Sequence, residues 1–372
     1  MVKQEDRVIV YAHGNDWDGV RSRQRYLVEA LSHYVPIIFL DGNWDKKGQV
    51  TIREIAPNIT VVRGLAKPMV QLKLRNMEMF SYLWGWWHSR WIRKKYRKIL
   101  FFDAENWLRP YRFIPHDVLV FDCIDPCFDR SPQVLADFED REQAILKQAA
   151  AVFATADTLY ASAKRYNANV TLLNNACAPE DYAPELLQAA LKPAWWPENG
   201  KPVAAYLGSV DWRFDIAATE RAALDHPEVQ FILAGNLIAE VADKCSGLLA
   251  LPNVTVPGKV SVEDGRYLLA HCAIGLIPFI PGEMNDAINP VKMYAYAYLG
   301  KPIVGTAVHE LATRPEIADT GTEPAAFSAA VGRALLRSHS PLEADKLKAF
   351  AAANTWDKRA EQAWVVLEKL FI

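Results

Sequence analysis

Short apolar runs of strand length alternate with amphipathic stretches of helix length along almost the whole chain. This alternation is typical of parallel sheets built from successive strand–helix–strand units. The runs fall into two sets separated by a break, so the sequence predicts two α/β sheets. We expect strands at 7–12, 36–40, 59–62, 98–102, 118–121, 151–154 and 170–173, and then at 203–207, 229–234, 254–257, 274–278 and 302–305.

The break between the two sets is rich in proline. Of the 22 prolines in the chain, five lie at 179, 184, 193, 197 and 202. Because proline ends helices and lacks a backbone donor, this stretch is typical of a linker between domains. We therefore expect an α/β domain at 1–178, a linker at 179–201, a second α/β domain at 202–342 and a C-terminal helix at 343–372.

Composition narrows the class of protein. With 372 residues, of which 51% are hydrophobic and 23% charged, the chain can bury two full cores. Its net charge of -2 gives no reason to expect a nucleic-acid partner. No apolar run is long enough to span a bilayer, and the amino terminus lacks the pattern of a signal peptide. Five scattered cysteines are typical of reduced thiols, so we expect a cytoplasmic protein.

The segment 273–306 places a polar loop between an apolar strand and a helix. The loop carries Glu283, Asn285, Asp286 and Asn289. Asn289 is a favoured helix cap and Pro290 suits the first helical turn, so we expect a helix N-terminus that faces the loop. Such an N-terminus attracts phosphate, and Lys292 adds a positive charge one turn into the helix. An ordinary crossover between two buried strands explains the same residues equally well.

Three strands of the second set end in glycine. These strand ends contribute Gly208 with Ser209, Gly235, and Gly258 with Lys259 and Val260. Glycine has no Cβ, so a ligand can approach the backbone closely at such a point. Arg213 follows the first of these ends and could hold a phosphate or a sugar carboxylate with its fork of donors. A strand-to-helix turn with a surface arginine is the alternative.

The order and spacing of these strand ends over residues 200–310 resembles the donor domain of the GT-B glycosyltransferases. The likeness is to bacterial polysaccharide enzymes related to the xanthan-assembly glucuronosyltransferase and to family 4-like members. The resemblance implies two Rossmann-like domains that face a cleft, with a C-terminal helix returning to the first domain. It implies a nucleotide-sugar donor whose diphosphate lies at Gly208, Ser209 and Lys292. The base would then be bracketed by Gly258, Lys259 and Val260.

The same resemblance sets further expectations for the donor. We assign Arg213, Gly235 and Asn289 to the donor site as well. UDP is the expected carrier, with GDP and dTDP left open, and neither a metal nor another cofactor is expected. Many retaining members carry two glutamates separated by seven residues, and the matching positions here are Ala287 and Ala295. Their replacement favours transfer with inversion.

Inversion requires a base that takes a proton from the acceptor hydroxyl. Asp125 follows the strand at 118–121, and the corresponding Asp of the resembled enzymes is thought to be their base. Asp122 is an alternative, although one of the two carboxylates is expected to stabilise the turn. His13 ends the first strand, where several inverting GT-B families place a catalytic His, so it competes with Asp125 for this role.

The loop after the first strand is the expected acceptor side. Trp17 offers an apolar platform for a sugar ring, and Asp18, Arg21 and Asp122 are assigned with it to acceptor binding. Arginines at the start of the following helix oppose its dipole. Such a local conflict indicates an anionic partner, because sites that break local rules are often functional.

The segment 71–100 combines basic and aromatic residues. It holds eight Lys or Arg residues against one Glu. Four tryptophans, Trp84, Trp86, Trp87 and Trp91, lie between these charged residues. Aromatics with a rim of cations suit the headgroup region of an anionic bilayer, so we expect peripheral binding to the inner face of the cytoplasmic membrane. A core helix with a solvated basic end is the alternative.

These observations predict a glycosyltransferase that moves a sugar from a nucleotide diphosphate sugar to a lipid-linked saccharide or glycolipid. Two alternatives remain open from the sequence. One is a sugar-nucleotide epimerase of the same fold, and the other is a catalytically inactive GT-B scaffold protein of a polysaccharide assembly complex. Binding of UDP separates the scaffold from the two enzymes.

Overall fold

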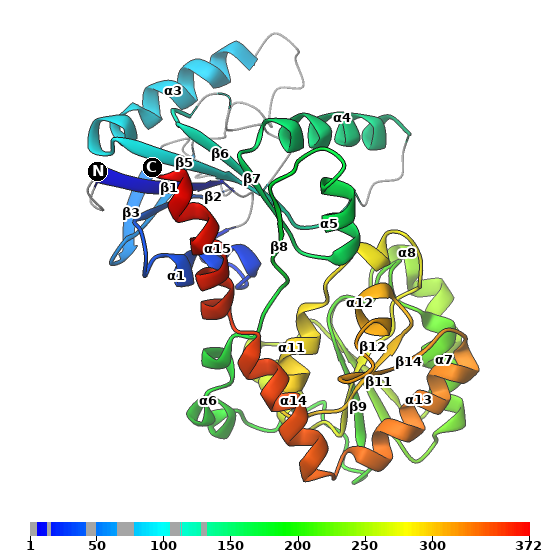
Figure 1. The fold of residues 1–372 in the computed structure, drawn as a ribbon. Coiled ribbons are helices and arrows are strands. Elements are labelled where there is room, and N and C mark those ends of the chain that lie inside the picture. The colour runs from blue at the N-terminus through cyan, green and yellow to red at the C-terminus, as the bar shows by residue number, and fades with distance from the viewer. Residues whose placement is uncertain are drawn as a thin grey trace. The chain divides into compact units, whose positions relative to one another are not determined.

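The computed structural model describes residues 6–12, 16–41, 50–64, 78–104, 112, 114–127 and 132–372. The chain divides into two compact units (Figure 1). The first unit combines Met1–Asn174 with the C-terminal segment Trp356–Ile372, and the second unit is Asn175–Thr355. Each unit is built around its own sheet.

The sheet of the first unit has the strand order β3-β4-β2-β1-β5-β6-β7-β8. Its paired strands are parallel except for β3 and β4. The central strands are buried along nearly their whole length, as expected when helices cover both faces. The strands are β1 (Arg7–Ala12), β2 (Ile37–Asp41), β3 (Thr51–Ala56), β4 (Ile59–Arg63), β5 (Lys98–Asp103), β6 (Val118–Cys123), β7 (Ala151–Ala154) and β8 (Val170–Leu172). The helices are α1 (Arg23–Leu31), α3 (Glu78–Lys95), α4 (Pro132–Gln148), α5 (Asp157–Ala163) and α15 (Trp356–Leu370).

The strand β3 has no counterpart among the strands expected from apolar runs. Its four central residues are exposed, because it forms the edge of the sheet and pairs antiparallel with β4. The turn between the two strands places Asn58 at a φ of 66°, a left-handed conformation that asparagine tolerates. An exposed strand of this kind carries no hydrophobic signal.

The sheet of the second unit is parallel throughout and has the order β11-β10-β9-β12-β13-β14. Its strands are β9 (Val203–Leu207), β10 (Gln230–Ala234), β11 (Val254–Gly258), β12 (Ile274–Ile277), β13 (Ile303–Thr306) and β14 (Ala318–Gly321). The chain builds outward from β9 to β11, and then returns to place β12 on the other side of β9. In open α/β sheets, ligands bind beyond the carboxyl ends of the strands at such a reversal.

Helices and short turns connect these strands. They are η3 (Pro179–Tyr182), α6 (Pro184–Ala189), α7 (Ile216–Asp225), α8 (Ala239–Ala242), η4 (Asp243–Cys245), α9 (Ser246–Leu249), α10 (Val262–His271), η5 (Asn285–Ala287), α11 (Val291–Tyr298), α12 (His309–Ala312), α13 (Pro324–Arg337) and α14 (Pro341–Ala353). The expected linker at 179–201 contains η3 and α6 and belongs to the second unit, where α6 packs on α10.

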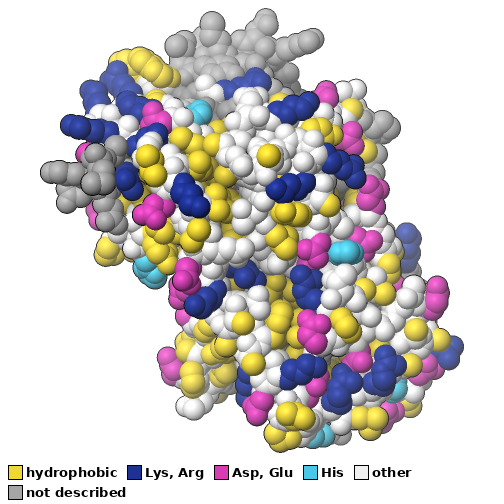
Figure 2. Space-filling view, viewed as in Figure 1, with side chains coloured by type: hydrophobic (Ala, Val, Ile, Leu, Met, Phe, Trp, Pro, Cys, Tyr) yellow, Lys and Arg dark blue, Asp and Glu magenta, His cyan; other side chains and the backbone are white. Residues whose placement is uncertain are grey.

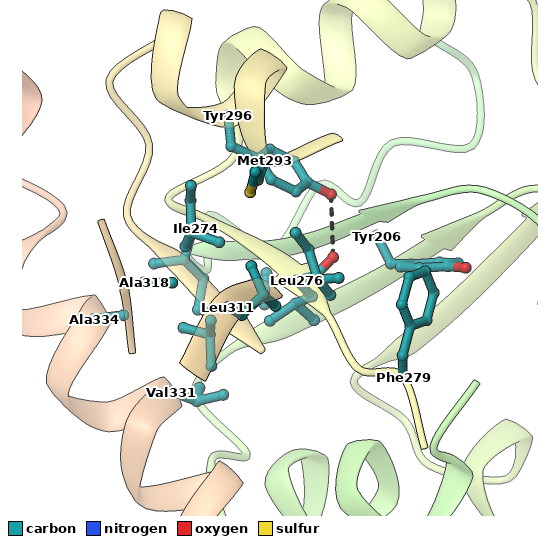
Figure 3. Packing of buried hydrophobic residues seen from close by; sticks show 14 of the residues in the cluster. Tyr206, Ile274, Leu276, Phe279, Met293, Tyr296, Leu311, Ala318, Val331 and Ala334 are labelled. Atoms are coloured by element: carbon teal, nitrogen blue, oxygen red, sulfur yellow. Dashed lines mark hydrogen bonds between the residues drawn. The ribbon is translucent and has the colours of Figure 1, made fainter. Parts of the chain in front are cut away.

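The core of the second unit fixes α11 to the sheet (Figure 3). The hydroxyl of Tyr296 donates to the carbonyl of Ala205 at 2.9 Å and to that of Leu276 at 3.3 Å. A Cβ at Gly275 would lie 2.3 Å from the Tyr296 ring, so the ring occupies space that only glycine leaves on β12. These contacts hold α11 against β9 and β12.

The expected single helix at 343–372 is two helices. Its first part lies in α14, which packs on α11 in the second unit, while α15 packs on α1 in the first unit. The break falls at Asn354, whose φ of -128° and ψ of 59° are not helical. The carbonyl of Asn354 accepts a hydrogen bond from the Cys177 N–H at 2.8 Å, which a continuing helix would prevent. Helical spacing runs through this break, so the sequence pattern conceals it.

Within the described residues, no helix combines the length and the apolar character needed to cross a bilayer.

Candidate functional site

Three glycines lie side by side where β9, β10 and β11 end. The Gly208 N–H donates to the carbonyl of Ala234 at 2.8 Å, and the Gly235 N–H donates to that of Gly258 at 2.8 Å. A Cβ at Gly235 would lie 2.0 Å from the Gly208 carbonyl oxygen, so the close approach of the two turns requires glycine there. Gly258 has a φ of 78°, and a Cβ built on it meets no atom within 4 Å. This glycine row (Gly208, Gly235 and Gly258) is a strip of backbone without side chains at the carboxyl edge of the sheet.

Lys292 reaches the glycine row from the first turn of α11. A Cβ at Gly208 would lie 3.0 Å from the Lys292 Nζ. The same Nζ lies 4.8 Å from the ring centre of Tyr206 and 5.0 Å from that of Phe279. Figure 3 shows these two rings next to each other at one end of the core cluster. Although the residue as a whole is half-buried, its ammonium is enclosed by rings and backbone.

The charge of Lys292 lacks a close counterion within the part of the chain that the structure describes. Among the described residues, no carboxylate oxygen lies within 4.0 Å of its ammonium. Burial, and next the charge of Arg213, lower the pKa of Lys292 to about 8, while Asp211 acts in the opposite direction. A buried cation of this kind gains from an anion placed beside it. The glycine row and Lys292 together therefore place one cation beside a strip of backbone that a phosphate can approach closely.

Arg213 is less available to a ligand than we expected. Its Nε lies 3.0 and 3.1 Å from the two carboxylate oxygens of Asp211, and its Nη2 lies 2.5 Å from one of them. Burial acts to raise the pKa of Asp211, but the hydrogen bonds and charge of Arg213 outweigh it and hold that pKa low. The expected fork of donors is therefore already committed in part to Asp211. Asp211 and Arg213 lie only two residues apart in the sequence, and this spacing could have indicated the ion pair.

Asn289 does not cap α11. The N-cap of α11 is Pro290, and Asn289 is 3% exposed. Its side-chain oxygen accepts from the Asn175 N–H at 2.9 Å and from the Tyr294 hydroxyl at 3.0 Å, and its amide donates to Glu310 at 2.5 Å. The assignment of Asn289 to donor binding is therefore corrected: it positions the loop before α11 rather than facing a ligand.

Glu310 was not indicated by the sequence. It is fully buried, and besides Asn289 it pairs with Arg314 at 3.0 Å. Its carboxylate joins α12 to the loop before α11, although α11 and β13 separate that loop from α12 in the chain. No local pattern distinguishes this carboxylate from a surface glutamate, so only the fold reveals it.

The remaining donor-side residues lie at the same edge. The Ser209 carbonyl accepts from the Tyr206 hydroxyl at 2.8 Å, which fixes the turn after β9. Lys259 is exposed at the end of β11, and Val260 is half-buried against the core cluster around Val203. Ala287 and Ala295 are 5% and 9% exposed, so both are nearly buried.

In the first unit, Asp122 is a structural residue. Its carboxylate is fully buried and accepts from the Arg23 Nη2 at 2.9 Å, the Arg23 Nε at 3.2 Å and the Tyr11 hydroxyl at 2.7 Å. Burial, and next the Asp122 charge, raise the pKa of Tyr11 well above its usual range. The assignment of Asp122 to acceptor binding is therefore corrected. Asp125 lies beyond the end of β6 and is exposed, so its carboxylate is accessible.

Trp17 is also buried rather than open. It is 3% exposed, its ring meets Phe39 edge-on at 5.1 Å, and the Arg25 guanidinium lies 5.0 Å over it. A sugar cannot stack on this ring without displacing Arg25, so the expected platform is corrected. Asp18 pairs with Arg53 at 2.9 Å and with Arg63 at 2.7 Å, and Arg21 pairs with Glu29. His13 lies outside the described residues.

The helix α3 has a buried face and an exposed aromatic face. Ser89 and Ile92 are buried, as is Tyr96 directly after the helix, whereas Trp86 and Trp87 are 52% and 54% exposed. The Arg90 guanidinium lies 3.5 Å over the Trp87 ring, and Lys94 and Lys95 are exposed on the following turn. Figure 2 shows hydrophobic and basic side chains next to one another over this end of α3, at the upper left of the view. One face of this helix thus belongs to the core and the other is an aromatic and basic surface, while membrane binding by that surface stays a prediction.

Comparisons with known proteins place the fold. No family model matches the chain. TuaH of Bacillus subtilis, named as a teichuronic acid biosynthesis glycosyltransferase, is 28% identical over 104 residues, which are 28% of this chain. The match spans about a quarter of that relative's length, 26%.

Solved structures match almost the whole chain. The sucrose-phosphate synthase of Thermosynechococcus elongatus has a TM-score of 0.76 and 16% identity, and covers 98% of this chain with 99% of its own. HepE of Anabaena, solved in complex with UDP and glucose, has a TM-score of 0.66 and 12% identity over 97% and 99% of the two chains. A UDP-forming trehalose-phosphate synthase of Burkholderia xenovorans has a TM-score of 0.66 and 13% identity over 98% and 99%. The chain therefore has the GT-B fold, and the fold class expected from the sequence is confirmed.

Proposed function

We propose that the protein is a glycosyltransferase that moves a sugar from a UDP-sugar to a lipid-linked saccharide or glycolipid acceptor. The observation that carries this proposal is the position of Lys292 against Gly208 at the end of β9. In the described part of the chain, no carboxylate oxygen lies within 4.0 Å of this cation. Such a cation, beside a strip of backbone that lacks side chains, suits a diphosphate leaving group. The solved complex of HepE with UDP and glucose supports a uridine nucleotide on this fold.

In the proposed reaction, the acceptor oxygen attacks the anomeric carbon of the donor sugar. The bond from that carbon to the diphosphate oxygen breaks, and UDP leaves with the electron pair. Asp125 takes the proton from the acceptor hydroxyl. Lys292 stabilises the charge that builds on the diphosphate, and the glycine row lets the diphosphate lie close to the backbone. The alanines at 287 and 295 support inversion, because neither position offers a carboxylate to the donor.

The exposed face of α3 supports a lipid-linked acceptor. Trp86 and Trp87 can insert at the headgroup level, while Arg90, Lys94 and Lys95 face anionic lipids. We propose that this surface holds the protein at the inner face of the cytoplasmic membrane, where such acceptors are presented.

Calorimetric titration with UDP, followed by transfer assays with UDP-sugars and membrane extract, tests the proposal. We expect UDP to bind to wild-type protein and more weakly to Lys292→Met. Binding of UDP without transfer from any UDP-sugar would instead favour the inactive scaffold. Failure to bind UDP, GDP and dTDP would remove the nucleotide-sugar proposal altogether. Conversion of one UDP-sugar into another without an acceptor would identify an epimerase.

A further inference from the structure

The loop between β9 and α7 carries an exposed tryptophan at its apex. Trp212 is 39% exposed, while Val210 and Phe214 on either side of it are 1% exposed. The loop begins at Gly208 in the glycine row and ends at Asp215, whose side chain accepts from the Ala218 N–H at 2.9 Å and caps α7. Because Val210 and Phe214 are buried on either side of it, the structure of the loop itself places the Trp212 indole at the surface.

Hydrogen bonds to both neighbouring strand ends hold this loop rigidly. On the β10 side, the Val210 N–H donates to the Asn236 carbonyl at 2.8 Å, and Ile238 donates to Val210 at 3.0 Å. On the β12 side, Asp215 donates to the Pro278 carbonyl at 2.7 Å, and Ile280 donates to Arg213 at 2.7 Å. Trp212 therefore has a fixed backbone position, which a ligand-binding side chain requires.

The neighbours of Trp212 in the chain are polar and belong to the Lys292 site. Asp211 and Arg213 form an ion pair, and both interact electrostatically with Lys292. The Arg213 guanidinium also lies 5.8 Å over the Trp212 ring. An aromatic surface with a few fixed polar groups is the usual composition of a site for a small polar ligand.

The strand order indicates which part of the donor meets Trp212. Gly258 lies on β11, two strands from β9, and the Lys292 Nζ lies at Gly208. With the expected base at Gly258 and the proposed diphosphate at Gly208, the sugar falls on the β12 side of the site. The apex of the loop lies between its bonds to β10 and its bonds to β12, and Arg213 next to Trp212 already bonds to Ile280 on the β12 side.

We propose that Trp212 is a sugar-specificity residue, on whose indole the apolar C–H face of the donor's hexose ring stacks. This proposal rests on the proposed function, because it takes the donor to be a UDP-sugar. It assigns to the loop 208–215 a role that neither the glycine row nor Lys292 can supply, which is to distinguish UDP-sugar from UDP.

Calorimetric titration of Trp212→Ala with UDP and with UDP-sugars tests the assignment. The probes are UDP, UDP-glucose, UDP-galactose, UDP-N-acetylglucosamine and UDP-glucuronic acid. Loss of the buried contact should weaken binding of the preferred UDP-sugar by about tenfold and leave the UDP affinity unchanged. Trp212→Phe keeps an aromatic face and should recover most of the affinity. Tyr166→Ala, at a residue of the first unit that is 36% exposed, is the matched control and should change neither affinity.

The outcomes separate this proposal from the function on which it rests. Equal weakening for UDP and UDP-sugar would place the indole at the base or the diphosphate and overturn the sugar assignment. Unchanged affinity for both would make Trp212 an ordinary surface residue, while the proposed function would stand. Failure of wild-type protein to bind any of the five probes would overturn both.

Discussion

The Lys292 ammonium occupies the space that a side chain at Gly208 would need. A Cβ at that position would lie 3.0 Å from Nζ, 3.2 Å from Cε and 3.2 Å from the Tyr206 hydroxyl. The Lys292 ammonium therefore depends on the absence of a side chain at Gly208, directly after β9. Changing either residue should affect the same step, the binding of the diphosphate.

Gly208→Ala should weaken UDP binding by about tenfold or more, because the methyl group displaces the ammonium and a charged hydrogen bond is lost. Calorimetry measures the effect. Gly265→Ala is the matched control, since a Cβ there would meet Leu207 at an ordinary 3.4 Å. It replaces a helical glycine in α10 and should slightly stabilise the protein without changing UDP affinity. Equal UDP affinity of both variants and wild type would contradict the arrangement.

The affinity for UDP should depend on pH through Lys292. Its pKa is lowered to about 8 in the unliganded protein, so the amine is charged below that pH and increasingly neutral above it. A bound diphosphate favours the charged form, so affinity should be flat at lower pH and fall as pH rises through about 8. Above this point, binding should take up protons, which appears as a dependence of the binding heat on the buffer's ionisation enthalpy.

The same titration of Lys292 affects folding stability in the opposite direction, because it makes the free energy of unfolding rise with pH. The folded state lowers the pKa of Lys292 from 10.5 to about 8, so between these values the unfolded chain binds more protons. The Lys292 contribution to stability therefore rises with pH across this window.

Lys292→Met is the control for the pH dependence of UDP affinity, and it should bind UDP weakly with little pH dependence. An unchanged pH profile of UDP affinity in that variant would assign the titration to another group.

Asp125→Asn should abolish sugar transfer while leaving UDP affinity and the thermal unfolding midpoint nearly unchanged. The residue is exposed, so removing its charge costs little stability. Transfer rates and calorimetry on the same preparation check both parts. Retained turnover would remove Asp125 from the base role and leave His13 as the candidate.

Asp122→Ala, unlike Asp125→Asn, should strongly lower the stability of the protein. It leaves the buried Arg23 guanidinium without its carboxylate, which costs about 3–5 kcal/mol in the free energy of unfolding. Urea denaturation measures this loss. Adding Arg23→Leu to the first change should restore part of the stability, because the unpaired charge is removed. Glu361→Ala breaks an exposed ion pair with Lys358 on α15 and should leave stability nearly unchanged.

Replacement of Trp86 and Trp87 by alanine should abolish sedimentation with vesicles that contain anionic lipid. Arg90→Gln with Lys94→Gln should weaken the same binding, and added salt should mimic that second effect but not the first. Transfer to a short water-soluble acceptor should be unaffected in every variant. Equal sedimentation of wild type and the double Trp variant would exclude α3 as the contact.

The sequence predicted the buried strands well because each is a nearly continuous apolar run. It failed at β14, whose residues Ala318–Gly321 are not an apolar run, and at the exposed edge strand β3. The failures share one cause: neither strand carries the hydrophobic signal on which the prediction depended. The break at Asn354 was hidden for the complementary reason, since helical spacing continues across it.

The proximity of the glycines and Lys292 was predictable because strand ends of a parallel sheet meet at one edge. The errors at Asp122 and Asn289 arose because polarity does not reveal burial. Asp122 is paired with Arg23 and Asn289 with Asn175, and each partner lies about a hundred residues or more away in the chain. Trp17 was misassigned for the same reason, since its cover by Arg25 and Phe39 is tertiary.

The three positions of the glycine row differ in how well they tolerate a side chain, and this decides which of them a variant library can change. Position 235 admits no side chain, because even a methyl group would overlap the Gly208 carbonyl. Position 258 has open space around it and is restricted only by its left-handed backbone, which asparagine can adopt. A variant library that tests the proposed base site should therefore keep 235 fixed and begin with Gly258→Asn.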